Sequence, residues 1–254
     1  LPFSLSATQA LFFDPARRKG GKRSFSVQDY QPPLSIIQNW LPACPNLGIK
    51  ISPGVQLEEI EGYPAEVEFI SLRGELKEAV LWFGNLQTTW RRATLLPGPF
   101  TFTVPAGLED TIPAAALAPQ RQVLALLEPQ SYLLEPDPAI LRAGLVQPLG
   151  MTLGAAQLDA QIAYLTSVEP VVSPFVRTWK IEAWLPFSLK RLKAFLRERK
   201  VGQVTVKKRG SPLQPEELMR LLHLKDTKEN RAERVLVLTH LRGDPIVIIC
   251  YPNW

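Results

Sequence analysis

The sequence predicts an α/β protein: an open sheet with an antiparallel edge, followed by a smaller α/β domain. Two observations lead to this fold class. Over the first hundred residues, short apolar strands and one helical segment give way to two hairpins. Over the last eighty, strands and amphipathic helices follow the order β-α-β-α-β-β. The 254 residues are enough for one large domain or two ordinary ones.

The first elements are identified from apolar runs and the turn residues between them. Strands are expected at residues 9–13 and 48–52, and a helix at 34–41 after Pro32-Pro33. Alternating segments on either side of short turns predict two hairpins. These are 66–72 with 78–84 around Arg73-Gly74, and 91–96 with 100–104 around Pro97-Gly98-Pro99.

The middle of the chain is rich in Pro and Ala and carries little charge. Helices are expected near 119–127, 138–147 and 155–165, and Pro170 and Pro174 indicate a boundary. The predicted domains are therefore 1–105, a mostly helical connector at 106–174, and 175–254.

The last domain begins with a predicted strand at 178–185. Ser188 then caps a helix whose Leu189, Leu192, Phe195 and Leu196 share one face. A strand at 203–208, a helix that starts at Pro215, and strands at 234–241 and 245–251 complete it. The tryptophans in strand-like segments, Trp179 among them, are interpreted as core residues.

Charge is distributed unevenly along the chain. Residues 190–209 hold nine basic side chains and one acidic one, a local charge of +8 in a chain whose net charge is +5. Clustering of this kind is typical of proteins that bind polyanions, although a solvated helix face would look the same.

Asp14-Pro15 ends the first apolar strand and is the first candidate site. In open α/β sheets, ligands bind outside the carboxyl ends of the strands. Asp14 could accept a hydrogen bond from an amine there, or could simply cap the following turn. Lys50 or Ser52 would lie at the same edge if the next strand is parallel.

Two basic segments are candidates for phosphate contacts. The first surrounds Gly20-Gly21 and could equally be an exposed loop; the second follows the strand at 203–208. Their members are Arg17, Arg18, Lys19, Lys22 and Arg23, and Lys207, Lys208 and Arg209.

Several chemistries have no sequence support. The chain has no G-x-S-x-G, no Walker loop and no G-x-G-x-x-G. His223 and His240 have no metal-ligand spacing, so no metal is expected. No apolar run approaches the roughly 18 residues of a membrane helix. Cys44 and Cys250, far apart in sequence, favour the reducing cytoplasm.

ALFFDPARR resembles the Asp-Pro-Pro-Tyr motif of class I S-adenosylmethionine-dependent methyltransferases. The resemblance extends along nearly the whole chain, to the members of that class with a C-terminal THUMP-like domain. Its segments are DYQPPLS, IKISPG, EFISLRGELKEAVLWFG, RRATLLP, EPDPAILRAGL, IAYLTS and VKKRG. It implies the second half of a Rossmann-like methyltransferase sheet plus a THUMP-like domain.

The resemblance implies a methyltransferase that uses S-adenosylmethionine and acts on RNA. Asp14 and Pro15 match the motif, whereas Ala16 and Arg17 replace its second proline and its aromatic residue. The glycine-rich cofactor loop precedes this motif in such enzymes, so it is expected upstream of Leu1. This chain is then expected to be the C-terminal part of a longer protein and inactive alone.

Two alternatives remain open at this stage. One is a non-catalytic RNA-binding protein with a degenerate methyltransferase core, which the Ala16-Arg17 replacement permits. The other is an assembly protein that binds no nucleic acid. RNA binding that weakens steeply with salt would separate the first from the second.

Overall fold

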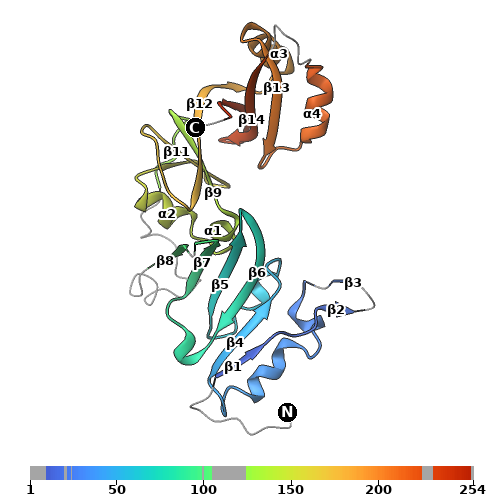
Figure 1. Ribbon diagram of the computed structural model, residues 1–254, viewed down its shortest axis with the longest axis vertical. Helices are drawn as coiled ribbons and strands as arrows, with labels where there is room; N and C mark the ends of the chain where they lie inside the picture. The colour runs from blue at the N-terminus through green and yellow to red at the C-terminus, as the bar shows by residue number, and fades with distance from the viewer. Residues whose placement is uncertain are drawn as a thin grey trace. The chain divides into compact units, whose positions relative to one another are not determined.

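The computed structural model describes residues 10–19, 22–23, 25–98, 100–104, 124–224 and 231–252 (Figure 1). The chain divides into two compact units. The first contains Leu1–Arg121 and Asp137–Leu145, and the second contains Gln122–Pro136 and Val146–Trp254. The predicted three-part division at residues 105 and 174 remains a prediction.

The principal sheet of the first unit has six strands in the order β1-β4-β6-β5-β7-β8. β1 is parallel to β4 and β5 to β7, while the other neighbours are antiparallel. The strands are β1 Ala10–Phe13, β4 Asn46–Ile51, β5 Glu66–Leu72, β6 Glu75–Trp82, β7 Arg91–Leu96 and β8 Phe100–Thr103. The open α/β sheet with an antiparallel edge is confirmed.

Shorter elements surround this sheet. β2 (Arg18–Lys19) and β3 (Lys22–Arg23) form a two-stranded hairpin. The 3-10 helices are η1 Val27–Asp29, η2 Leu34–Asn39, η3 Leu57–Glu59 and η4 Gly84–Leu86. The helix expected at 34–41 is therefore present as a 3-10 helix, with Leu34 and Ile37 facing the core.

Helix α1 (Pro138–Arg142) belongs to the first unit, although the residues directly before it, Gln122–Pro136, belong to the second. Asp137 caps it by accepting a hydrogen bond from the Ala139 backbone N–H at 2.8 Å. The Arg142 guanidinium donates to the carbonyl oxygens of Pro53 (2.9 Å) and Val55 (2.6 Å). It also lies 5.2 Å from the centre of the Phe69 ring. These contacts fasten α1 to the sheet and to the loop after β4.

The sheet of the second unit has seven strands in the order β10-β11-β9-β12-β15-β14-β13, with only β13 and β14 parallel. Its longest strand, β12, pairs with β9 through its first half and with β15 through its second. The strands are β9 Tyr132–Pro136, β10 Ala156–Asp159, β11 Ile162–Ser167, β12 Val176–Pro186, β13 Val201–Lys208, β14 Ala232–Leu241 and β15 Asp244–Cys250.

Alternation along β14 and β15 divides the buried residues of this unit between two cores. Leu236 and Leu238 face helices α3 (Leu189–Glu198) and α4 (Pro215–Leu222), which contribute Leu192, Leu196, Leu218 and Leu222. Val235 and Val237 face the other way and pack with residues of β9 to β12, including Leu133, Tyr164 and Trp179. The predicted order β-α-β-α-β-β is thus confirmed, and both faces of the strands are covered.

Three predicted helices differ from the structure. The helix expected at 155–165 is wrong, because β10 and β11 form a hairpin there and Asp159 accepts a hydrogen bond from the Gln161 backbone N–H in its turn. The helix at 138–147 is divided into α1 and α2 (Val146–Thr152) at Gly144, whose φ is +71°. Of the helix near 119–127, residues 119–123 lie outside the described residues, and 124–127 are non-helical. Strand β9 was not predicted.

Within the described residues, no helix combines the length and the apolar character needed to cross a bilayer.

Asp159 connects the β10–β11 hairpin to the end of β14. Its carboxylate accepts hydrogen bonds from the backbone N–H groups of Gln161 (2.9 Å) and Arg242 (2.8 Å), and lies 3.3 Å from His240 Nδ1. Burial raises the pKa of Asp159, but these hydrogen bonds and His240 outweigh that effect, so the net pKa is lowered.

We expect Asp159→Ala to lower the free energy of unfolding at pH 7 by about 1–3 kcal/mol, because two backbone N–H groups lose their acceptor. A lowered pKa stabilises the fold above the unfolded-state value of about 3.9 and ceases to do so as the pH falls through the folded-state value. The difference in melting temperature from the wild type should therefore shrink below about pH 4. An unchanged difference at pH 3 would contradict this account. Asp244→Ala, at the exposed first residue of β15, is the control.

Candidate functional site

The carboxyl ends of β1 and β4 form one edge of the first sheet. The two strands are parallel, with Phe13 opposite Ile49, so the next residues, Asp14 and Lys50, lie side by side. Lys50 Nζ is 3.4 Å from Asp14 Oδ2. The expectation that a parallel β4 would bring Lys50 to the same edge as Asp14 is confirmed.

Lys50 also pairs with Glu78 on the next strand, β6, at 2.9 Å. The pKa of Lys50 is raised, chiefly by its hydrogen bond with Glu78 and, against some desolvation, by the charges of Glu78 and Asp14. Lys50 therefore stays cationic between two carboxylates. The Asp14 side chain remains 52% exposed, so one of its faces is open to a ligand.

The chain that follows Asp14 is held against the sheet. Pro15 is buried, and Ala16 exchanges two backbone hydrogen bonds with Gln31, at 3.2 and 2.9 Å. Arg17 Nη1 donates to the Ile51 carbonyl oxygen at 3.3 Å, at the end of β4. Asp14 and Arg17 thus lie at the ends of neighbouring strands.

The rest of the basic loop forms the β2–β3 hairpin, in which Arg18 pairs with Arg23 and Lys19 with Lys22. The side chains of these four residues, and the turn at Gly20-Gly21, lie outside the described residues. Their predicted contact with phosphate remains a prediction.

The buried side chains of Tyr30 and Ser52 form hydrogen bonds with the backbone just after β4. The Tyr30 hydroxyl accepts a hydrogen bond from the Ser52 backbone N–H at 2.8 Å, and Ser52 Oγ accepts one from the Gly54 N–H at 3.3 Å. Sequence reasoning did not assign Tyr30 or Glu78 to the site. Tyr30 was visible only as part of the DYQPPLS segment, and Glu78 only as one of the alternating residues of a strand.

The three basic residues at the end of β13 do not share one surface. Lys208 is exposed, whereas Lys207 and Arg209 face β9 and β11. Lys207 Nζ lies 2.5 Å from Glu135 Oε2. Arg209 donates to the Ala163 carbonyl oxygen at 2.8 Å and lies 4.6 Å from the centre of the Tyr164 ring. Alternation along the strand separates residues that are adjacent in sequence.

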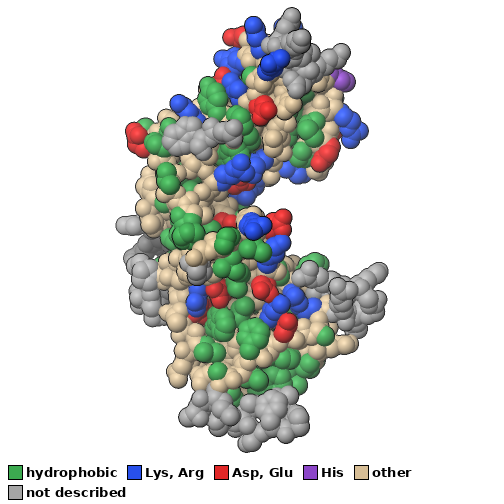
Figure 2. All heavy atoms as spheres, in the orientation of Figure 1, with side chains coloured by type: hydrophobic (Ala, Val, Ile, Leu, Met, Phe, Trp, Pro, Cys, Tyr) green, Lys and Arg blue, Asp and Glu red, His purple; other side chains and the backbone are tan. Residues whose placement is uncertain are grey.

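Helix α3 presents an exposed basic surface. Lys190, Arg191 and Arg197 are exposed, and no ion pair joins them to any residue that the structure describes. Figure 2 displays Lys and Arg side chains gathered over this part of the second unit. Arg199 differs, because it pairs with Glu182 at 2.8 Å. The exposed cations of this segment with no ion pair in the described part of the chain are Lys190, Arg191 and Arg197 of α3, together with Lys200 and Lys208.

Comparisons with known proteins show what this chain is similar to. Residues 176–252 match the family described as THUMP domain-like. The chain is 32% identical over 219 residues to an uncharacterized S-adenosylmethionine-dependent methyltransferase of Mycobacterium tuberculosis, a match to 85% of this chain and 56% of that protein. The same match is found in strains CDC 1551 / Oshkosh and ATCC 25618 / H37Rv.

A solved structure is similar as well. It is the crystal structure of a methyltransferase candidate from Porphyromonas gingivalis W83, with a TM-score of 0.72 and 25% identity over 96% of this chain and 59% of that one. The chain therefore spans little more than half the length of its relatives. Together the comparisons confirm the resemblance to S-adenosylmethionine-dependent methyltransferases with a THUMP-like domain.

We expect Tyr30→Phe to lower the free energy of unfolding by about 1–3 kcal/mol, because it leaves the buried Ser52 N–H without an acceptor. In the same variant, the hydrogen-exchange rate of the Ser52 amide, measured by NMR, should increase relative to the wild type. Tyr63→Phe, at a less buried tyrosine, is the control. Equal exchange at Ser52 in the variant and the wild type would show that another group holds this amide.

Proposed function

We propose that this chain is part of an S-adenosylmethionine-dependent methyltransferase that acts on RNA, at a base amine or a ring nitrogen. The observation that carries the proposal is the half-exposed Asp14 carboxylate at the carboxyl end of a parallel strand, paired with Lys50 at 3.4 Å. The named activity of the relatives supports the reaction class, and the THUMP-like match together with the basic surface of α3 supports RNA.

In this proposal Asp14 accepts a hydrogen bond from the acceptor nitrogen and so directs the nitrogen lone pair toward the methyl group. Pro15 fixes the backbone beside it. Lys50, itself held by Glu78, keeps the carboxylate at the edge of the sheet. Methylation of an N–H nitrogen would release one proton, which would pass to water at the exposed Asp14 carboxylate, and positioning supplies much of the acceleration. A base in a duplex would first have to leave the stack.

S-adenosylmethionine would supply the methyl group. The described residues fit the acceptor side of such a site, but they include no glycine-rich loop at this edge on which the cofactor could lie. We therefore assign the cofactor to no residue of this chain. Because the relatives are almost twice as long as the match, we propose that this chain is the C-terminal part of a longer enzyme.

Calorimetry with S-adenosylmethionine tests the reaction class directly. Binding by the protein of the complete reading frame, and not by this chain, is the expected result. Binding by neither protein would contradict the methyltransferase and leave the RNA-binding alternative.

Asp14→Asn in the complete protein should reduce methyl transfer by about 100-fold or more, within the range that precise positioning contributes, and should change RNA affinity less than twofold. The assay is transfer of a radiolabelled methyl group to total RNA from a strain that lacks the gene. Glu75→Gln, at an exposed carboxylate, is the control. Unchanged turnover in Asp14→Asn would remove this residue from the mechanism.

The exposed cations of α3 should supply part of the RNA affinity. For the triple variant Lys190→Ala, Arg191→Ala, Arg197→Ala, we expect the slope of log affinity against log salt to become shallower by about 2, roughly 0.7 for each lost contact with single-stranded RNA. Fluorescence anisotropy with a labelled RNA at several salt concentrations measures it. A wild-type slope in the variant would place the RNA elsewhere.

One observation favours the non-catalytic alternative. Arg17 occupies the position of the motif's aromatic residue, and its guanidinium donates to the Ile51 carbonyl oxygen. A guanidinium engaged in this way is less free to stack on an acceptor base. An RNA-binding protein with a degenerate core would keep salt-dependent RNA binding in the complete protein and would bind no cofactor.

A further inference from the structure

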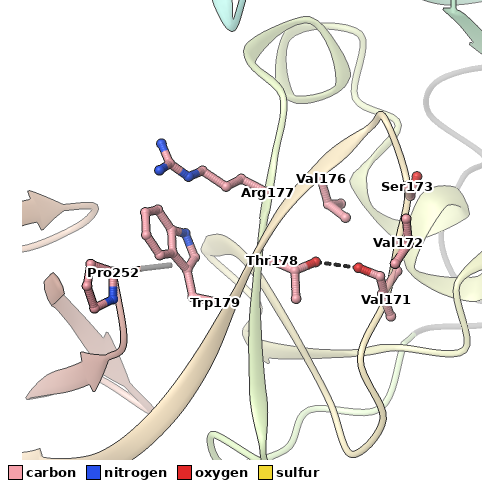
Figure 3. Close-up of a pocket in the computed structure, with 8 residues that line it drawn as sticks. All are labelled: Val171, Val172, Ser173, Val176, Arg177, Thr178, Trp179 and Pro252. Carbon is pink, nitrogen blue, oxygen red and sulfur yellow. Dashed lines mark hydrogen bonds between the residues drawn. The ribbon is translucent and has the colours of Figure 1, made fainter. Parts of the chain in front are cut away.

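A shallow hollow lies beside β12 in the second unit (Figure 3). Its walls are residues 171–173, the first residues of β12, and Pro252 near the end of the described chain. Thr178 Oγ1 donates to the Val171 carbonyl oxygen at 2.6 Å, which holds the loop against the strand. The side chain of Val172 at its margin is 98% exposed.

Trp179 forms the inner wall of this hollow. It is only 3% exposed, as expected for a core residue, and its indole N–H has no hydrogen-bond partner among the described residues. The Arg177 guanidinium lies 4.0 Å from the centre of the indole ring, beside which Pro252 is also placed (Figure 3). Lys207 Nζ lies 5.5 Å from the same ring.

The outer part of Arg177 is open to solvent. Arg177 is exposed, and no carboxylate in the described part of the chain forms an ion pair with it. The ring of Trp179 holds the guanidinium in place by a cation–π contact, so its plane is oriented before any ligand arrives. The result is a flat, cationic surface on a rigid support.

The surroundings of Arg177 are positive. Lys207 approaches the same indole, but its charge is offset by Glu135, with which it pairs at 2.5 Å. Arg209, the residue after β13, lies 4.6 Å from the centre of the Tyr164 ring. Three cations and one carboxylate thus gather around two aromatic rings, which favours an anionic ligand with a planar group.

We propose that this hollow binds one nucleotide of single-stranded RNA, with its base stacked on the outer face of the Arg177 guanidinium. The inference rests on the proposed function and adds to it the site and the mode of recognition. Guanidinium planes and aromatic rings are the surfaces on which unpaired bases stack, and such stacking tolerates any base.

Arg177→Lys separates stacking from charge, because lysine keeps the cation and loses the plane. The probe is a fluorescein-labelled 12-nucleotide single-stranded RNA, bound to the whole 254-residue chain and followed by anisotropy. A second probe of the same length has abasic riboses and so the same phosphates without bases. Arg220→Lys, at an exposed arginine in the last turn of α4, is the matched control.

We expect Arg177→Lys to weaken binding of the RNA by about fivefold or more, and to leave the abasic probe and the salt dependence unchanged. Arg220→Lys should match the wild type with both probes. Equal binding of RNA by Arg177→Lys and the wild type would overturn the proposal while leaving RNA binding elsewhere intact. The proposal would also be overturned if an octaglutamate peptide, which carries negative charge but no base, lost as much affinity as the RNA in Arg177→Lys. If the wild type binds neither probe, the RNA proposal and this site fail together.

Discussion

The parallel pairing of β1 with β4 is the constraint on which the candidate active site depends. With Phe13 opposite Ile49, Asp14 just after β1 and Lys50 near the end of β4 meet at 3.4 Å. A register shift of one residue would place Asp14 beside an isoleucine and turn the lysine to the other face of the sheet. The buried side chains of β4 oppose such a shift, because Leu47, Ile49 and Ile51 would all leave the core. The geometry of the carboxylate is therefore set by apolar packing several residues away.

In the second unit, the sheet determines which cations are available. The net charge of residues 190–209 overstates the charge offered to a partner, because Arg199 and Lys207 pair with Glu182 and Glu135. Both carboxylates come from other strands, so no count within the segment could detect them. The exposed charge is concentrated on α3, Lys200 and Lys208, whereas Arg199, Lys207 and Arg209 lie against aromatic rings.

Most of the fold could be predicted from the sequence, since the strands of the first sheet and the whole β-α-β-α-β-β order have strong periodicity and clear turn residues. The failures were in the Ala- and Pro-rich middle. There the helical propensity of AAQLDAQIAYL lost to a turn made by the Asp159 side chain and to pairing with β9. For the site, the edge shared by Asp14 and Lys50 followed from a parallel sheet, but Glu78 and Tyr30 did not. Tyr30 is 22 residues from Ser52 and Glu78 is 28 residues from Lys50 in the sequence, and only the fold brings these partners together.

The position of β12 bears on where this protein could be divided. The THUMP-like match begins at residue 176, and β12 begins at the same residue. The first half of β12 nevertheless pairs with β9, and Trp179 and Val237 pack against residues of β9 to β11, all of which precede the match. A piece cut at the family boundary would keep every matched residue and yet leave the first half of β12 unpaired and Trp179 and Val237 uncovered, a surface prone to self-association. The folding unit is therefore larger than the unit of sequence similarity, and a separable domain would have to include β9, α2, β10 and β11.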